Sequence, residues 1–315
     1  MRSESSTPKP IKLPTRHGIS PSCVWLPRAL HSTLLDFLTT RFHEIPRTTW
    51  ITRLEQGLVL NQHGVAFHLD SPYITDQHIY YYRNVENEER IPFEETVLYQ
   101  DEHLLVTDKP HFLPVIPSGK YVQETLLARL KNKLGLDDLA PIHRIDRETA
   151  GLVLFSINPA TRDAYQTLFR ERTIHKTYEA IAMVNANLSM PMTYQSRMVK
   201  GEPFFRMKET EGAANSETRL EVLETYGNIA KYQLSPITGK QHQLRVHLAA
   251  LGIPIVYDPF YPELLNWKED YDKPLQLLAK QVRFIDPITG KNHLFTSERE
   301  LLDVESIAAD LAHRQ

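Results

Sequence analysis

The sequence is short of cysteine and of long apolar runs, and each shortage excludes a class of protein. Cys23 is the single cysteine among 315 residues, so an intramolecular disulfide is impossible and a cysteine-based zinc site is not expected. No apolar run approaches the roughly 18 residues that cross a bilayer, and the polar start of the chain has no signal-peptide core. We therefore expect a soluble, cytoplasmic protein that does not associate with a membrane.

Lysine is missing from the front of the chain. None occurs between Lys12 and Lys109, whereas lysine and arginine recur through the rest. The net charge of −3 does not exclude a polyanionic partner, because only a local basic surface is needed to hold phosphates. The asymmetry predicts a neutral to acidic front part and a back part that handles a polyanion.

The pattern along the chain predicts two domains, in line with about 150 residues per domain. Residues 1–20 are rich in Ser, Pro, Lys and Arg without periodicity, which indicates a disordered tail. Residues 30–83 show two helical patterns followed by short strand patterns, which predict a small α+β module. The polar stretch 84–90 predicts a linker, and the second domain then covers residues 91–300.

Strand and helix patterns both occur in the second domain. Residues 152–155 form a continuous apolar run, which is typical of a strand buried on both faces. Asn158 is placed to cap the helix that follows, and Thr238 to cap a further helix that ends at Gly252. These patterns predict the α+β class.

Four charged residues in the segment 143–151 directly precede the buried strand. Loops at strand ends often carry functional side chains. A lone Asp in such a loop is nevertheless more often a residue that caps a turn. The interpretation of Asp146 therefore depends on whether other segments of the chain accompany it.

Two other segments accompany the segment around Asp146, and the three together resemble a known family. The run HRIDRETAGLVLF (143–155) resembles the catalytic motif of the RluA-type RNA pseudouridine synthases. The run KTYEA (176–180) resembles the family's Lys-x-Tyr strand, and TGKQHQLRVHL (238–248) resembles its third motif. With the earlier Asp-Lys-Pro at 108–110, the resemblance spans about residues 91–297.

The resemblance implies both a fold and an activity. The fold is an α+β catalytic domain with a mixed, mainly antiparallel sheet flanked by helices, and the module 30–83 resembles an S4-like RNA-binding domain. The activity is isomerisation of specific uridines in structured rRNA or tRNA to pseudouridine by a monomer without metal or organic cofactor. Asp146 would be the catalytic carboxylate, Tyr178 would pack on the target base, Arg245 would pair with Asp146, and Arg144 would hold the base out.

The chemistry asks for the same residue types. Isomerisation requires cleavage of the N-glycosidic bond, rotation of the uracil, and a new bond from C5 to C1′. A carboxylate can attack C1′ or remove the C2′ proton, and the sequence leaves both routes open. A guanidinium about 4 Å from a carboxylate attracts it by on the order of 4 kcal/mol at an effective dielectric of 20. This attraction offsets part of the cost of burying the charge and so helps to keep a buried carboxylate ionised. An aromatic ring recovers about 1–3 kcal/mol by stacking on the flipped base.

Further candidates for RNA contacts are basic or imidazole side chains in the motifs and on a helix predicted near residues 123–133: Arg144, Arg147, Lys176, Lys240, His242, Arg129, Lys131 and Lys133. A solvated surface is the competing interpretation of these charges. The two histidines of the third motif, His242 and His247, are five residues apart, off the four-residue spacing of a helical metal pair. We therefore expect no metal site.

Three other functions share part of this residue pattern. A protein kinase also carries His-Arg followed by Asp, but the chain has no glycine-rich loop and no Asp-Phe-Gly. A glycosidase would need a second carboxylate opposite Asp146, for which Glu148 and Asp258 are the candidates. A ribosome-associated RNA-binding protein that keeps the fold without turnover is the main alternative, and the intact trio of Asp, Tyr and Arg speaks against it.

The sequence also departs from the family pattern. Lys240 stands where the family has Arg after Gly, and Leu278 stands where it often has His. Tyr257 replaces the glycine that usually precedes the aspartate at position 258. None of these changes removes a proposed catalytic group, and they indicate an atypical branch.

Overall fold

Three stretches of the chain are described by the computed structural model: residues 13–83, 88–265 and 269–312. The chain divides into two compact units, a front unit of residues 1–89 with 116–137 and a second unit of residues 90–115 with 138–315. The second unit contains the three segments that resemble the family's catalytic motifs, and it is called the catalytic unit for that reason. The sequence analysis assigned the segment 116–137 to the second domain, whereas in the structure it belongs to the front unit. Within the described stretches, no helix is both long enough and apolar enough to span a bilayer.

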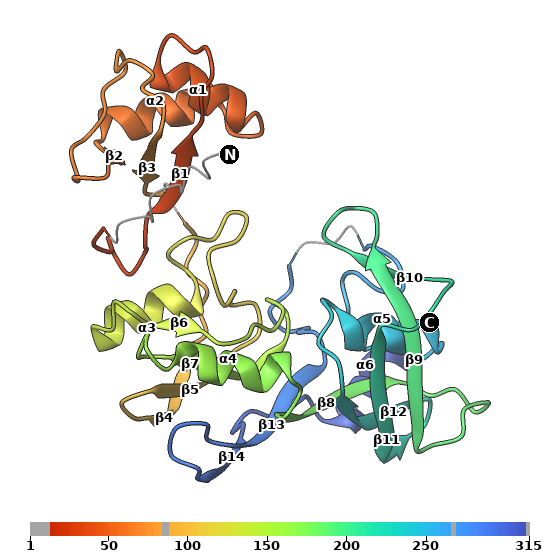
Figure 1. Cartoon of the computed structure of the whole chain (residues 1–315). Helices are drawn as coiled ribbons and strands as arrows, with labels where there is room; N and C mark the ends of the chain where they lie inside the picture. The colour runs from red at the N-terminus through yellow and green to blue at the C-terminus, as the bar shows by residue number, and fades with distance from the viewer. Residues whose placement is uncertain (1–12, 84–87, 266–268, 313–315) are drawn as a thin grey trace. The chain divides into compact units, whose positions relative to one another are not determined.

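The front unit contains a small antiparallel sheet and two helices at its start (Figure 1). Their bounds are β1 (Ser22–Leu26), α1 (Leu34–Arg41), α2 (Arg47–Glu55), β2 (Val59–Asn61) and β3 (Gln77–Tyr81), and the strand order is β1-β3-β2. Thr33 begins α1 because its hydroxyl accepts the N–H of Asp36 at 3.1 Å. Leu38 and Trp50 bury the helices against Ile79 of β3. The two predicted helices and the strands after them are present, while β1 was not predicted.

A third helix, α3 (Leu126–Leu134), completes the front unit. It ends at Gly135, which adopts the left-handed conformation with φ 67° that helix ends favour. Ile19 is buried against Val122 and Ala128 beside this helix. The structure thus differs from the predicted tail, because residues 13–20 have an apolar anchor; residues 1–12 of that tail and residues 84–87 of the predicted linker lie outside the described part.

The catalytic unit is built on one large sheet. Its strands are β4 (Thr96–Gln100), β5 (Leu104–Lys109), β6 (Ala140–Pro141), β7 (Ala150–Ser156), β8 (His175–Met183), β9 (Met192–Lys200), β10 (Met207–Thr210), β11 (Ser216–Tyr226), β12 (Ile229–Pro236), β13 (Leu277–Ile285) and β14 (Asn292–Thr296). The main path is β10-β9-β11-β12-β8-β13-β7-β5-β4, with β14 on β13 and β6 on β7. The pair β13–β7 is parallel and the other pairs are antiparallel. The predicted mixed, mainly antiparallel sheet and the α+β class are confirmed.

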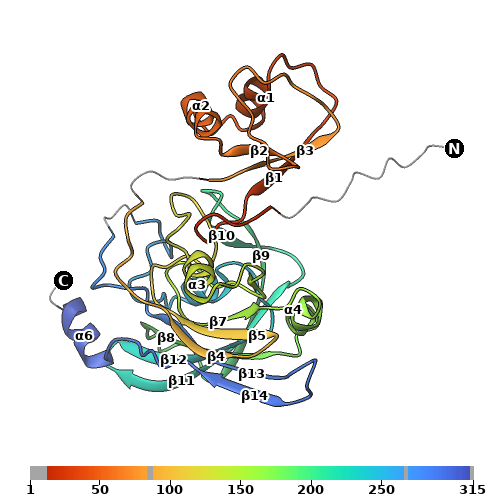
Figure 2. The same ribbon diagram turned by 90° about the vertical axis from the view of Figure 1, so that its left-hand side faces the viewer.

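Three helices cover this sheet: α4 (Arg162–Arg170), α5 (Gln243–Ala250) and α6 (Val304–Ala312). Helix α4 packs its apolar side on β5 and β7 (Figure 2). Helix α5 packs against Ala180 of β8, whereas α6 packs against Ile181 of the same strand. Since neighbouring side chains of a strand point to opposite faces, α5 and α6 cover opposite faces of the sheet.

Two predicted helix starts are wrong. Helix α4 has its N-cap at Thr161, because the Asn158 side chain closes a separate turn by accepting the N–H of Ala160 at 2.9 Å. Helix α5 has its N-cap at His242, and the Thr238 hydroxyl instead donates to the Gln243 side chain at 2.6 Å. Asn158 and Thr238 do form local hydrogen bonds, but each bond belongs to the turn that precedes the helix. The strand over 152–155 is confirmed as part of β7, which is buried along its whole length.

Candidate active site

Asp146 lies in the loop between β6 and β7. The N–H of Thr149 donates to the Asp146 carbonyl at 3.2 Å, which closes the loop into a turn. The Asp146 side chain keeps 23% of its surface exposed, so its carboxylate can be reached from solvent. The loop therefore presents one partly open carboxylate next to the fully buried strand β7.

Lys109, at the end of β5, is hydrogen-bonded to the backbone of this loop. Its ammonium donates to the carbonyls of Pro110, Leu113 and Arg147 at 2.9, 2.8 and 3.0 Å. His111 Nδ1 donates to the carbonyl of Glu148 at 2.6 Å. Burial lowers the pKa of Lys109 to about 7 and that of His111 to about 4. These two side chains hold the backbone directly after Asp146.

Arg245 of α5 meets the loop from the other side. Its side chain has no exposed surface, and Nη1 donates to Asp146 Oδ2 at 3.2 Å. Its Nε and Nη2 form a bidentate pair with Asp258 at 2.8 and 2.6 Å. Nη1 also lies 3.6 Å from Glu148 Oε2. The sequence analysis predicted the pairing of Asp146 with Arg245, and the structure brings these two side chains together.

The charge on Arg245 is set by opposing effects. Burial disfavours a charged guanidinium, but the carboxylates of Asp258, Asp146 and Glu148 outweigh burial and raise the pKa of Arg245 above its ordinary value. The guanidinium carbon also lies 4.8 Å from the centre of the Phe260 ring, a cation–π distance. Arg245 is therefore a permanent buried cation, and one of its donors is directed at Asp146.

His242 forms a second layer behind Asp146. Tyr261 accepts the N–H of Met207 at 2.7 Å, and its hydroxyl lies 2.9 Å from His242 Nδ1. If Tyr261 donates its own proton to Nδ1, the proton of His242 lies on Nε2, 3.8 Å from Asp146 Oδ1. Burial lowers the pKa of His242, so the ring is neutral near pH 7. The sequence analysis predicted an RNA contact for His242, whereas the structure buries it.

Tyr178 of β8 lies near the same carboxylate. Burial, followed by the negative charge of Asp146, raises the pKa of Tyr178 above its ordinary value. Lys176 is two residues earlier and so shares its face of the strand. The Lys176 ammonium lies 3.9 Å from where a side chain on Gly239 would begin, which places it beside the turn before α5. The structure thus brings Asp146, Arg245 and Tyr178 together from a loop, a helix and a strand.

The predicted phosphate contacts of the catalytic unit separate into two groups. Arg144 and Lys240 are exposed, as a phosphate contact requires. Arg147 forms ion pairs with Glu148 at 3.4 Å and with Glu269. Its guanidinium is therefore occupied by carboxylates of its own chain.

The predicted basic face of α3 does not form. The Arg129 guanidinium pairs with Glu124, and its side chain is only 11% exposed. Lys131 is buried and donates to the Ser20 hydroxyl at 3.2 Å. Lys133 is exposed. Residues two apart on a helix point in different directions, so an alternating basic sequence cannot give one continuous basic face.

Asp258 is part of the site, although no role there was predicted for it. The sequence suggested it only as the second carboxylate of a glycosidase and as the aspartate that follows the family's glycine position. Its side chain has no exposed surface and both oxygens are bound to Arg245, so it cannot activate a water molecule. The position of Asp258 in the sequence could have indicated this role, because it directly follows Tyr257, where the family usually has glycine. In the described part of the chain, no three His, Cys, Asp or Glu side chains are grouped as metal ligands.

Comparisons with known proteins indicate one family. A family model described as RNA pseudouridylate synthase matches residues 103–250. An uncharacterised RNA pseudouridine synthase of Synechocystis is 30% identical over 72% of this chain and 79% of its own length. The dual-specificity RNA pseudouridine synthase RluA of Haemophilus influenzae is 31% identical over 65% of this chain and 93% of its own. The solved structure of human RNA pseudouridylate synthase domain containing 1 covers 70% of this chain and 95% of its own, with a TM-score of 0.54 and 23% identity.

Proposed function

We propose, since the chain belongs to the RluA-type RNA pseudouridine synthases and so isomerises uridine in RNA, that Asp146 is its catalytic carboxylate. The observation that supports this most directly is the 3.2 Å hydrogen bond from the fully buried Arg245 to Asp146. A buried cation held by a second carboxylate is a fixed positive charge, and it stabilises the negative charge that the reaction needs. The Asp146 side chain is 23% exposed, so its carboxylate can be reached from solvent by a substrate.

The reaction can proceed by two routes from this carboxylate. In the first, a carboxylate oxygen of Asp146 bonds to C1′ while the bond from C1′ to N1 breaks and the uracil leaves with the electron pair. The uracil turns, C5 bonds to C1′, and the carboxylate leaves. In the second, Asp146 removes the C2′ proton and a glycal forms as the uracil leaves with the electron pair; the turned uracil then bonds through C5 to C1′ while Asp146 returns the proton to C2′. Both routes end with loss of the C5 proton and a proton on N1, and neither requires a cofactor.

Tyr178 is the proposed contact for the detached base. A flipped uridine costs a few kcal/mol of stacking, and an aromatic ring returns about 1–3 kcal/mol. Because its pKa is raised, the Tyr178 hydroxyl keeps its proton at neutral pH. The protonated hydroxyl can donate a hydrogen bond to the base. It can take the proton from C5 only if it passes its own proton to another group at the same time.

The proposed substrate is rRNA or tRNA in the cytoplasm, bound by a monomer. Relatives that match the chain are named for tRNA and for the large ribosomal subunit. Arg144, Lys176 and Lys240 are the proposed phosphate contacts near Asp146, and Arg144 would also occupy the place of the flipped base. The front unit is proposed to bind RNA as an S4-like module does, and so to influence which RNA is chosen.

Asp146→Asn tests the catalytic assignment, because it keeps the shape of the side chain and removes its charge. The substrate is [5-³H]uridine-labelled total RNA from cells that lack the gene, and release of tritium reports loss of the C5 proton. Release should fall to background, while filter binding of the same RNA persists because the phosphate contacts are elsewhere. The matched control is Asp272→Asn, at an exposed Asp of the same unit, which should behave as wild type.

Two results would contradict the proposal. Tritium release by Asp146→Asn at a near wild-type rate would show that the carboxylate is not catalytic. No release by the wild-type protein, together with retained RNA binding, would favour the alternative of a non-catalytic RNA-binding protein that keeps the fold.

A further inference from the structure

Phe204 is the most exposed aromatic side chain in the described part of the protein, with 85% of its surface accessible. It lies in the loop 201–206 between β9 and β10. Single exposed apolar residues are common on protein surfaces, so exposure alone carries no inference. What distinguishes Phe204 is the structure that holds it in place.

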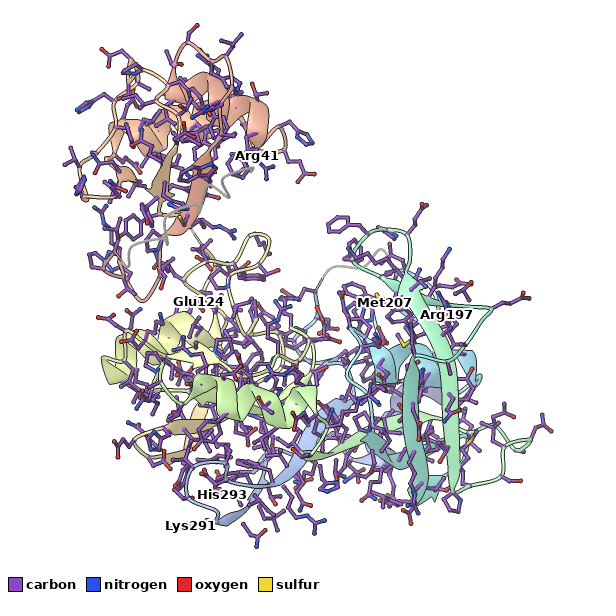
Figure 3. The ribbon with its side chains drawn as sticks, viewed as in Figure 1. Arg41, Glu124, Arg197, Met207, Lys291 and His293 are labelled. Carbon is purple, nitrogen blue, oxygen red and sulfur yellow. The ribbon has the colours of Figure 1, made fainter. Side chains whose placement is uncertain are left out.

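The loop is closed by its own hydrogen bonds. Gly201 N–H donates to the Arg206 carbonyl at 2.9 Å, and Arg206 N–H donates to the Pro203 carbonyl at 2.8 Å. Met207 follows the loop on β10, and Arg197 lies on the paired strand β9 (Figure 3). The tip is thus a defined turn of a two-stranded hairpin, and the position of Phe204 is fixed by it.

The hairpin is also attached to the active site. Gln241, in the turn before α5, donates to the Phe205 carbonyl at 3.2 Å. Arg206 donates to the Pro262 carbonyl at 2.8 Å. Met207 N–H donates to Tyr261 at 2.7 Å, the same hydroxyl that contacts the histidine behind Asp146. The loop and the catalytic carboxylate therefore share their supports.

An aromatic path connects Phe204 with the catalytic pair. The ring centres of Phe204 and Phe205 are 5.6 Å apart, and those of Phe205 and Phe260 are 5.2 Å apart. The Phe260 ring lies 4.8 Å from the Arg245 guanidinium, which bonds Asp146 at 3.2 Å. Each step is shorter than 6 Å, so Phe204 lies no more than a few nucleotide lengths from a uridine held at Asp146.

We propose that Phe204 is a substrate-binding residue that stacks on an unpaired base next to the target uridine. This inference rests on the proposed function. Aromatic faces bind bases of any sequence by stacking, and the exposed Lys200 and Lys208 flank the loop as phosphate contacts. The exposed Glu202 in the same loop repels a phosphate and so is not itself a phosphate contact.

The test compares Phe204→Ala, Phe204→Trp and wild type in the tritium-release assay on total RNA from cells that lack the gene. Loss of one stacked base should raise KM roughly 5- to 150-fold, while kcat at saturating RNA stays within about twofold because Phe204 does not touch the reacting atoms. Phe204→Trp keeps the stacking face and should restore KM. The matched control is Tyr226→Ala, which removes an aromatic side chain 45% exposed at the β11–β12 turn of the same sheet and should leave both constants unchanged.

A binding measurement separates this inference from the proposed function. The fluorescence of Phe204→Trp should be quenched by a single-stranded oligouridine about 12 nucleotides long, whether or not the protein turns over. Wild-type KM in Phe204→Ala, or no quenching in Phe204→Trp, would overturn the role of Phe204 while the catalytic assignment stands. Absence of tritium release by wild type with quenching retained would instead contradict the catalytic proposal alone.

Discussion

Replacing Arg245 by Met should remove the cation on which two carboxylates depend. The side chains of Arg245 and Asp258 have no exposed surface, so Asp258 would stay buried without its bidentate partner. Removing one partner of a buried ion pair costs about 3–5 kcal/mol. Since 1 kcal/mol shifts the midpoint by about 2–4 °C in a domain of 150–250 residues, the Tm should fall by roughly 6–20 °C.

A double variant separates stability from catalysis. In Asp258→Asn combined with Arg245→Met, the amide oxygen at position 258 can still accept the N–H groups of Phe260 and Tyr261, and no unpaired charge remains at that position. The double variant should therefore be at least about 1 kcal/mol more stable than Arg245→Met in urea unfolding. Tritium release should stay lost in both, because Asp146 has no cation.

Either of two results would refute this reasoning. A cost below about 1 kcal/mol for Arg245→Met is the value of an exposed ion pair, and it would mean that the pair with Asp258 is not buried. Recovery of turnover in the double variant would mean that Asp146 does not need Arg245.

Two further predictions concern the supports of the site and of the front unit. Because burial lowers the pKa of Lys109 from 10.5 to about 7, the folded protein binds fewer protons than the unfolded one between these values, and this contribution to stability grows as the pH rises from about 7 to about 10. Urea unfolding should show that gain in wild type and not in Lys109→Met, and parallel curves would contradict it. A chain that begins at residue 90 lacks Ile19, which covers Val122 and Ala128, so it should aggregate more readily than a chain that begins at residue 13; equal solubility and equal melting of the two would show that this contact is dispensable.

The sequence predicted those parts of the fold that depend on patterns along one segment. The fully buried β7 followed from its unbroken apolar run, and α1 and α2 followed from their helical periodicity. The start of α5 could not be found in this way. Thr238 is of a residue type that often caps helices, but its hydroxyl accepts the N–H of Glu217 at 2.9 Å. Only the folded sheet brings Glu217 near Thr238. Long-range partners of this kind are not visible in a local pattern.

The candidate site shows the same division between local and long-range information. The resemblance of three motifs to the family predicted Asp146, Tyr178 and Arg245 as one group, and the structure places them together. The burial of His242 and Lys131 was not predictable, because the sequence does not show which polar side chains find partners inside the fold. A basic or imidazole residue in a motif or on a basic helix therefore predicts an RNA contact from the sequence alone, whether or not the fold buries its side chain.

Tyr257 shows how a departure from the family pattern can be accommodated. It adopts φ 59°, a left-handed conformation that costs a residue with a side chain about 1–2 kcal/mol and that glycine adopts freely. The turn is needed because the next residue, Asp258, must direct both oxygens at Arg245 and also accept the N–H of Phe260 at 2.8 Å. The Tyr257 hydroxyl donates to Asp310 of α6 at 2.8 Å, a contact that glycine cannot make and that offsets part of the strain. In this chain, the residue that shapes the active-site turn therefore also attaches the C-terminal helix, so the substitution of glycine changes the support of the site and leaves its catalytic groups in place.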